Sequence, residues 1–223
     1  MAIRIILFLV GGIMSKIKTA VITGQHAFDV PGFHGLFRSI PEIDFYLQDL
    51  ENFAADAGKV RDQYDALVFY NFHRVTPDEG RIREAIEGLG EDGTGILVLH
   101  HAILAFPEWQ LWSDLCGIQD RSFGVQIDQT VHVDIVDSQH PTTRGLNPWE
   151  MVDEIYIMAD PGEDSDLLLT TDHPDSMKIL AWSRQYKNSR VFCCQSGHDD
   201  QVFSDSNFRT VISQGIQWLA GRS

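Results

Sequence analysis

Short runs of apolar residues, separated by segments with helical spacing, dominate the first half of the chain. These runs predict buried strands at residues 19–24, 43–50, 66–72 and 95–101. Runs that are apolar throughout, instead of alternating with polar residues, are typical of parallel strands that are buried on both faces. The first half of the chain therefore predicts a parallel sheet.

The segment between the third and fourth of these strands has the signals of a helix. Thr76 is a good N-cap, Pro77 suits the first helical position and Glu79 completes a capping box. The apolar face that follows consists of Ile82, Ala85, Ile86 and Leu89. A second helix is predicted to begin at Pro107 and to stop near Gly117. Helices between strands are the connections that parallel pairing requires.

The second half of the chain is richer in strand patterns. Strands are predicted at residues 129–137, 166–170, 178–182 and 190–195. An amphipathic pattern from about Ser206 onward predicts a terminal helix. We assign residues 14–223 to a single α/β domain with a flavodoxin-like, doubly wound, mostly parallel sheet and a β-rich insertion at 118–182.

The first residues of the chain need a separate interpretation. Residues 1–13 resemble the apolar core of a signal peptide, but no cleavage site of small residues follows, and the run is too short to span a bilayer. We expect a non-structural extension on a cytoplasmic protein, with secretion as the less favoured alternative. The three cysteines, Cys116, Cys193 and Cys194, form no disulfide framework and no C-x-x-C pair, which fits a reducing compartment.

Charge and glycine spacing restrict the ligands. The net charge of −15 argues against nucleic acid or an anionic membrane as the main partner, and favours a neutral ligand or one held through a metal ion.

One G-x-G-x-x-G match, at residues 88–93, follows a predicted helix and precedes a strand. A dinucleotide site needs the opposite order, so we interpret these glycines as a helix cap and a turn and expect no nucleotide cofactor.

Histidines follow several of the predicted strands. His26 follows the first strand, His73 the third and His198 the strand at 190–195, while His100 and His101 end the fourth. Parallel strands would bring these residues to one edge of the sheet, where α/β proteins bind ligands. Nearby polar residues are Asp29, Asn71, Asp199 and Asp200. Such a set can bind a divalent metal such as zinc or perform acid–base chemistry, although a histidine at a strand end is also a common structural residue.

Seven segments between residues 19 and 222 are informative when taken together. In chain order they are TGQHAFD, GILVLHHAILAFPEW, HPTTRGL, DEIY, LAWSRQYKNSRVF, SGHDDQVF and FRTVISQGIQWLAGR. This series of segments resembles the ThuA-like, or trehalose-utilisation, family. The resemblance implies a flavodoxin-like fold related to class I glutamine amidotransferases. It also implies a link to the catabolism of trehalose and related sugars, with oxidised (keto) sugar derivatives as the substrates.

Class I amidotransferases place a cysteine nucleophile after the fourth core strand and a histidine late in the chain. The present sequence has His100 and His101 after that strand, and the nearest downstream cysteine, Cys116, belongs to a later predicted helix. His198 matches the position of the late histidine. Without the cysteine, the resemblance implies that amidotransferase activity is absent.

Two functional classes remain open. The first is a sugar-processing enzyme with a histidine-rich site, and the second is a non-catalytic amidotransferase-like domain that binds a sugar or a partner protein. For the enzyme, the expected site comprises catalytic His101, His198 and Asp199, substrate-binding His100, Asn71, Asp153 and Glu154, and metal-binding His26 and His73. Asp153 and Glu154 rest on the DEIY segment alone. We expect a small-molecule carbohydrate as the ligand, and leave open whether the chain forms a homo-oligomer.

Overall fold

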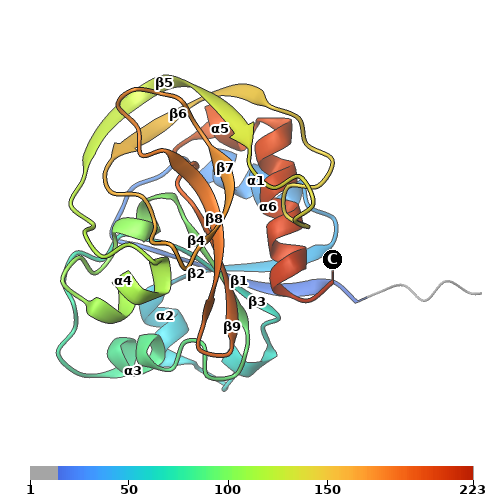
Figure 1. Cartoon of the computed structure of the whole chain (residues 1–223). Helices are drawn as coiled ribbons and strands as arrows, with labels where there is room; N and C mark the ends of the chain where they lie inside the picture. The colour runs from blue at the N-terminus through green and yellow to red at the C-terminus, as the bar shows by residue number, and fades with distance from the viewer. Residues whose placement is uncertain (1–14, 223) are drawn as a thin grey trace, which may run out of the picture.

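A nine-stranded sheet forms the centre of the computed structural model, which describes residues 15–222 (Figure 1). The expected extension at residues 1–13 lies outside this range. The strands are β1 (Ile17–Gly24), β2 (Ile43–Asp49), β3 (Ala66–Asn71), β4 (Gly95–Leu99), β5 (Gly124–Ile135), β6 (Trp149–Ile157), β7 (Asp166–Thr170), β8 (Ile179–Tyr186) and β9 (Ser189–Cys194). Their order across the sheet is β2-β1-β3-β4-β9-β8-β7-β5-β6.

The sheet is mixed, so the prediction of a mostly parallel sheet is wrong for its second half. The strands from β2 to β9 in this order pair in parallel. Beyond β9, each of β8, β7, β5 and β6 pairs antiparallel with its neighbour. The reversal begins at the tight turn through Lys187 and Asn188, because a two-residue hairpin can join only antiparallel strands.

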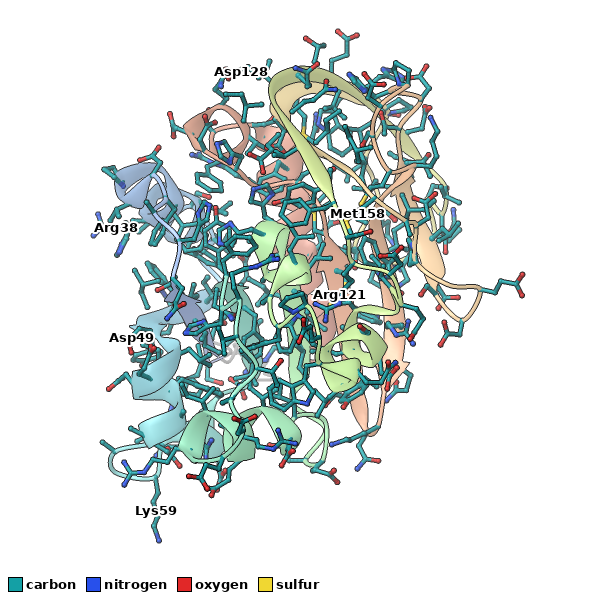
Figure 2. All side chains as sticks on the ribbon, turned by 90° about the vertical axis from the view of Figure 1, so that its left-hand side faces the viewer. Arg38, Asp49, Lys59, Arg121, Asp128 and Met158 are labelled. Carbon is teal, nitrogen blue, oxygen red and sulfur yellow. The ribbon has the colours of Figure 1, made fainter. Side chains whose placement is uncertain are left out.

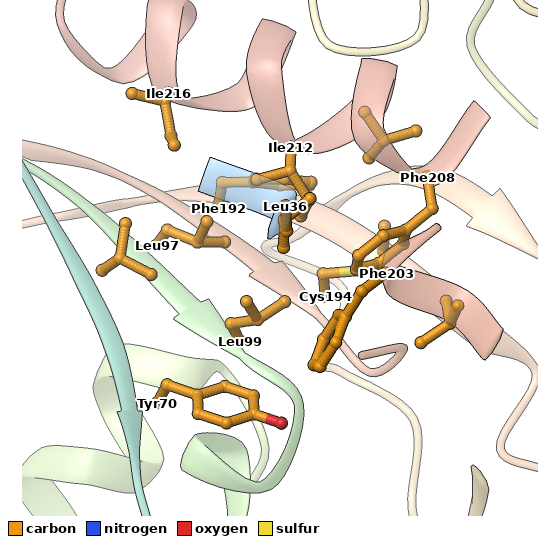
Figure 3. Packing of buried hydrophobic residues seen from close by; sticks show 14 of the residues in the cluster. Leu36, Tyr70, Leu97, Leu99, Phe192, Cys194, Phe203, Phe208, Ile212 and Ile216 are labelled. Carbon is orange, nitrogen blue, oxygen red and sulfur yellow. The ribbon is translucent and has the colours of Figure 1, made fainter. Parts of the chain in front are cut away.

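Helices cover both faces of the parallel half. One face carries α1 (Val30–Arg38) and α6 (Ser206–Leu219), and the other carries α2 (Leu50–Ala55), α3 (Arg81–Glu87) and α4 (Gln110–Cys116) (Figure 1). Figure 3 shows the first of these interfaces, where apolar side chains of α6 lie over β4 and β9. Two-sided burial explains why β3 and β4 are apolar along almost their whole length, whereas the edge strand β2 is buried only at its first residue and carries polar side chains. Short helical elements complete the fold: η1 (Arg61–Gln63), η2 (His100–Leu104) and α5 (Asp200–Phe203).

Two helices begin later than predicted. The capping box at Thr76 does not form: α3 begins at Arg81 after Gly80, and the Thr76 hydroxyl is buried without a partner. The second helix begins at Gln110, not at Pro107. The chain turns at Phe106, whose φ of 47° lies in the left-handed region, and the Arg121 guanidinium binds the Phe106 carbonyl, so helical structure is delayed by one turn.

The fourth strand is shorter than predicted and one strand was not predicted at all. β4 ends at Leu99, so His100 and His101 belong to η2. The strand β6 carries the DEIY segment and pairs with β5 in a long ribbon that arches over one end of the sheet (Figure 1). Within residues 15–222, no helix combines the length and the apolar character that crossing a membrane requires.

Candidate functional site

The turn after β4 places two imidazoles at the carboxyl edge of the parallel strands. His100 adopts a φ of 53°, in the left-handed region that side chains other than glycine rarely occupy. This conformation turns the chain from β4 into η2. Both imidazoles are consequently buried at the edge of the sheet, His100 with 1% and His101 with 3% of its surface exposed.

The hydrogen bonds of His100 define its tautomer. Its Nδ1 lies 2.7 Å from the carbonyl oxygen of Gln195. Because a carbonyl can only accept, Nδ1 carries the proton and Nε2 keeps a lone pair. The Tyr156 hydroxyl lies 3.1 Å from Nε2, and the two rings stack at 5.1 Å. Burial lowers the pKa of His100 well below its ordinary value, so the ring is neutral at pH 7.

Glu154 joins His100 to His198. Its carboxylate oxygens lie 3.5 Å from His100 Nε2 and 3.4 Å from His198 Nδ1. Burial raises the pKa of Glu154, and the neighbouring His198 partly opposes this rise. The His198 side chain is 32% exposed, so this imidazole connects the buried pair to solvent.

Asp153 has a different role from its neighbour Glu154. It is buried and accepts three backbone N–H groups, those of Gly197 at 2.9 Å, His198 at 3.1 Å and Glu154 at 2.9 Å. Burial raises its pKa to about 7, although these three bonds act in the opposite direction. Neighbouring residues on a strand point to opposite faces, which separates the two carboxylates. Asp153 therefore positions the loop that carries His198.

His101 has one satisfied and one unsatisfied nitrogen. Its Nε2 donates to the carbonyl oxygen of Tyr70 at 2.9 Å, so Nδ1 carries the lone pair, and Nδ1 is buried without a partner. Burial, followed by the neighbouring His26 whose ring stacks on it at 4.4 Å, lowers the pKa of His101 to about 3. A base this weak is poorly matched to proton transfer at neutral pH, whereas a neutral lone pair suits hydrogen bonding to a ligand.

The structure does not bring every predicted site residue into the same group. Asn71 contacts His73 at 3.3 Å, and His73 in turn contacts Glu51 of α2 at 3.3 Å and stacks on Phe106. None of these contacts involves His100, Glu154 or His198. The other three predicted residues lie closer: His26 stacks on His101, Asp153 holds the His198 loop, and Asp199 caps α5 through the Gln201 N–H.

Among the described residues, one group could hold a metal ion: His100, Glu154 and His198, whose ligand atoms all lie within 4.8 Å of one another. Two ligand atoms about 2.1 Å from a tetrahedral zinc are about 3.4 Å apart. The separations of 3.5 Å between Glu154 Oε1 and His100 Nε2 and of 3.4 Å between Glu154 Oε2 and His198 Nδ1 are each close to that value. The Gln195 carbonyl also fixes the His100 tautomer with the lone pair on Nε2, as an outer hydrogen bond does in known zinc sites. The group contains neither His26 nor His73.

Three further residues complete the surroundings of the site. Tyr70 donates its hydroxyl to the Gly197 carbonyl at 2.8 Å, Tyr156 packs on His100, and Gln195 orients His100 through its carbonyl. Tyr156 could have been predicted as a site residue, because it lies two positions after Glu154 and so on the same face of a strand. That prediction depends on recognising β6 as a strand, which the sequence analysis did not do.

Comparisons with known proteins give a consistent result. The family model described as "ThuA: Trehalose utilisation" matches residues 36–219. A ThuA-like protein from Parabacteroides merdae ATCC 43184 is similar in structure, with a TM-score of 0.73 and 22% identity over 92% of this chain and 90% of that one. A ThuA-like protein from Bacteroides uniformis ATCC 8492 has a TM-score of 0.71 and 18% identity, covering 95% of both chains.

A cytoplasmic protein from Salmonella typhimurium LT2 has a TM-score of 0.61 and 11% identity over 90% of this chain and 99% of that one. No curated protein sequence matches the chain. At these identities, likeness in structure shows the fold alone.

Proposed function

The chain belongs to the ThuA (trehalose utilisation) family, and from this membership we propose that it is an enzyme of carbohydrate catabolism that acts on a keto derivative of trehalose or a related sugar. The observation that carries the proposal is the joining of His100, Glu154 and His198 at the carboxyl edge of the parallel strands. Ligands of open α/β sheets bind at this edge.

We also propose a flavodoxin-like core related to class I glutamine amidotransferases. The order β2-β1-β3-β4-β9 in the parallel half supports this relationship, because flavodoxin-like sheets have the order 2-1-3-4-5. Amidotransferase activity is not part of the proposal. The turn after β4 carries His100 in place of a cysteine, and Cys116, Cys193 and Cys194 are all buried.

The chemistry available at the site suits proton transfer beside a carbonyl group. A keto sugar has weakly acidic C–H bonds next to its carbonyl. Glu154, whose pKa is raised by burial, takes such a proton, the electron pair moves to the carbonyl oxygen, and the partly exposed His198 hydrogen-bonds that oxygen. His101 and Asp199 contact sugar hydroxyls in this proposal, and Asp153 positions His198 without touching the substrate.

A divalent metal such as zinc is an alternative use of the same residues. The ligand atoms would be His100 Nε2, a Glu154 carboxylate oxygen and His198 Nδ1. The metal ion would act as a Lewis acid that polarises the carbonyl oxygen of the sugar. Asp153 and Gln195 would then keep their roles, because they orient the His198 loop and the His100 ring. His26 and His73, which the sequence suggested as ligands, are not needed for this group.

The proposal also includes a location and a type of ligand. We propose a cytoplasmic protein whose ligand is a small neutral carbohydrate. The three cysteines are free and buried, which fits a reducing compartment and so supports the location. The net charge of −15 supports a neutral ligand over nucleic acid or a membrane surface.

The proposed activity needs one copy of the chain only, because all residues of the site come from the same chain.

The test compares three variants. His198→Ala and Glu154→Gln alter the proposed site, and His132→Ala is the control, because His132 also lies 3.5 Å from a carboxylate, that of Asp134. We expect conversion of oxidised trehalose, followed by NMR, to fall about 100-fold or more in the first two variants and to be unchanged in the control. Equal activity in all four proteins would contradict the site.

Metal content, measured by mass spectrometry after purification without chelators, separates the two chemistries. Near-stoichiometric metal that is lost in His198→Ala and kept in His132→Ala supports the metal-assisted form. Activity without metal supports proton transfer by Glu154 and His198 alone. Stabilisation by sugars without any turnover would favour the non-catalytic binding domain.

A further inference from the structure

Six rings form a closed chain of contacts beside the His100–Glu154–His198 group. The centroid separations are 5.3 Å for His100–His101, 4.4 Å for His101–His26, 5.3 Å for His26–Phe72, 6.4 Å for Phe72–Phe123, 6.0 Å for Phe123–Tyr156 and 5.1 Å for Tyr156–His100. We call these six residues the ring cluster. Its members come from the ends of β1, β3 and β4 and from the β5–β6 ribbon.

The ring cluster has a buried end and an exposed end. His100, His101 and Tyr156 are buried, Phe72 is half-buried, and Phe123 and His26 are exposed. Val125 of β5 extends the exposed end, because it pairs directly with Tyr156 and so lies on the same face of the ribbon. Apolar ring surface therefore leads from solvent to the imidazoles of the site.

The polar atoms around the ring cluster are mostly acceptors. His101 Nδ1 is buried, bears a lone pair and has no partner. Beside the cluster, the Tyr70 ring lies 4.1 Å from that of His101, and burial together with the carboxylates of Asp153, Glu154, Asp199 and Asp29 raises the pKa of Tyr70. An unpartnered buried acceptor is costly unless a ligand supplies a donor. A ligand that donates hydrogen bonds, as sugar hydroxyl groups do, complements this acceptor.

The positive charge of Arg74, at the exposed end of the ring cluster, is used in contacts with the protein itself. Its guanidinium carbon lies 4.9 Å from the centre of the Phe72 ring and 5.6 Å from that of Phe123, and it donates to the Leu104 carbonyl at 3.3 Å. The ribbon is also held near its middle, where its pairing register shifts. Asp128, which lies at this irregularity (Figure 2), accepts from Gln201 of α5 at 2.8 Å. The wall formed by Phe123 and Val125 thus has a contact on each side, with Arg74 and through Asp128.

From these contacts we infer that the ring cluster is a second sugar subsite, which takes the ring of a glycoside next to the ring that reacts. Pyranose rings combine apolar C–H faces with hydroxyl donors around the edge. The faces fit against Phe72 and Phe123, and one hydroxyl donates to His101 Nδ1. The inference rests on the proposed function, since it makes the substrate a disaccharide or other glycoside and not a free monosaccharide.

The test measures dissociation constants by NMR titration of the intact protein with trehalose, glucose and adenosine. None of these probes carries the keto group. Phe123→Ala removes the exposed ring, and Ile127→Ala, at a side chain that is 58% exposed on the same strand, is the control. We expect Phe123→Ala to weaken trehalose binding about 3- to 10-fold, the value of one aromatic contact, and to leave glucose binding and the control unchanged.

Phe123→Leu serves as the second variant if Phe123→Ala does not fold, and His101→Gln tests the hydroxyl contact. An unchanged ratio of trehalose to glucose affinity in these variants overturns the subsite, as does the absence of trehalose binding. Adenosine binding with the same dependence on Phe123 also overturns it as a sugar site. The outcomes are separable: turnover that needs His198 but not Phe123 contradicts only the subsite, and Phe123-dependent binding without turnover contradicts only the proposed reaction.

Discussion

The carboxylate of Asp153 accepts the backbone N–H of His198 at 3.1 Å, across the boundary between the two halves of the sheet. Asp153 lies on the antiparallel strand β6, and His198 follows the parallel strand β9. The next residue, Glu154, contacts the imidazole of the same histidine. One strand of the antiparallel half therefore supplies both the support and the acid–base partner of His198.

Asp153 makes stability fall as the pH rises. Its pKa is about 7 when folded and about 3.9 in an unfolded chain, so the folded state holds the extra proton between these values. Unfolding releases that proton, which lowers the free energy of unfolding by up to about 1.4 kcal/mol per pH unit from pH 4 to 7. The advantage of wild type over Asp153→Asn should shrink over this range in urea unfolding, and then stay constant. A constant difference from pH 4.5 to 7.5 would contradict the prediction.

His101 makes stability fall as the pH falls, which is the opposite of the effect of Asp153. Its pKa is about 3 when folded, against about 6.5 when unfolded, so the unfolded state binds the extra proton as the pH falls below 6.5. His101→Gln keeps a donor for the Tyr70 carbonyl but cannot titrate. We expect the acid-side loss of stability to be shallower in this variant, by up to about 1.4 kcal/mol per pH unit. Urea unfolding at pH 6.5, 5.5 and 4.5 measures it, and identical slopes would refute it.

Removal of the Tyr70 hydroxyl should destabilise the site loop. The hydroxyl donates to the buried Gly197 carbonyl at 2.8 Å, and Tyr70→Phe leaves that carbonyl without this donor. The expected cost is about 1–2 kcal/mol of unfolding free energy. Tyr46→Phe is the matched control, because its hydroxyl binds Asp44 at the surface, and we expect a change below about 0.5 kcal/mol. Equal effects would show that Tyr70 does not hold the loop.

Arg121 should be essential for the turn that follows η2. Its guanidinium donates to the carbonyls of Ile103, Ala105 and Phe106 and to the Ser113 hydroxyl, all in the interior. Arg121→Met would leave these acceptors unpaired and should cost about 3 kcal/mol or more. Arg38→Met, at an exposed position, is the control and should have little effect. Thermal unfolding compares the two, and a small loss for Arg121→Met would contradict this role.

The parallel half of the fold was predictable from the sequence, because its central strands are buried on both faces and are therefore mostly apolar. All five parallel strands were located within about two residues of their observed ends. The strand β6 was missed because Glu150, Asp153 and Glu154 give it the composition of a loop. Its buried carboxylate is compensated by backbone N–H groups from the loop after β9, those of Gly197 and His198, which no local pattern reveals.

The candidate site was predictable in part. The rule that ligands gather at the carboxyl ends of parallel strands selected His100, His101 and His198, which the structure brings together. The same rule selected His73, whose contacts are instead with Asn71 and Glu51. The position of a residue at a strand end predicts the edge of the sheet at which it lies, but not the direction in which its side chain points. The contact of Glu154 with both imidazoles depends on the path of the β5–β6 ribbon, which the sequence did not supply.

The three residues of the His100–Glu154–His198 group are distant in the sequence. Two of them, His100 and His198, follow β4 and β9, which are adjacent in the sheet. Contacts between distant segments slow folding, and β9 is synthesised after the other eight strands of the sheet. A nascent chain that ends before β9 cannot contain the group. A ligand of the complete group therefore stabilises only the finished protein, by mass action, and cannot guide the earlier steps of folding.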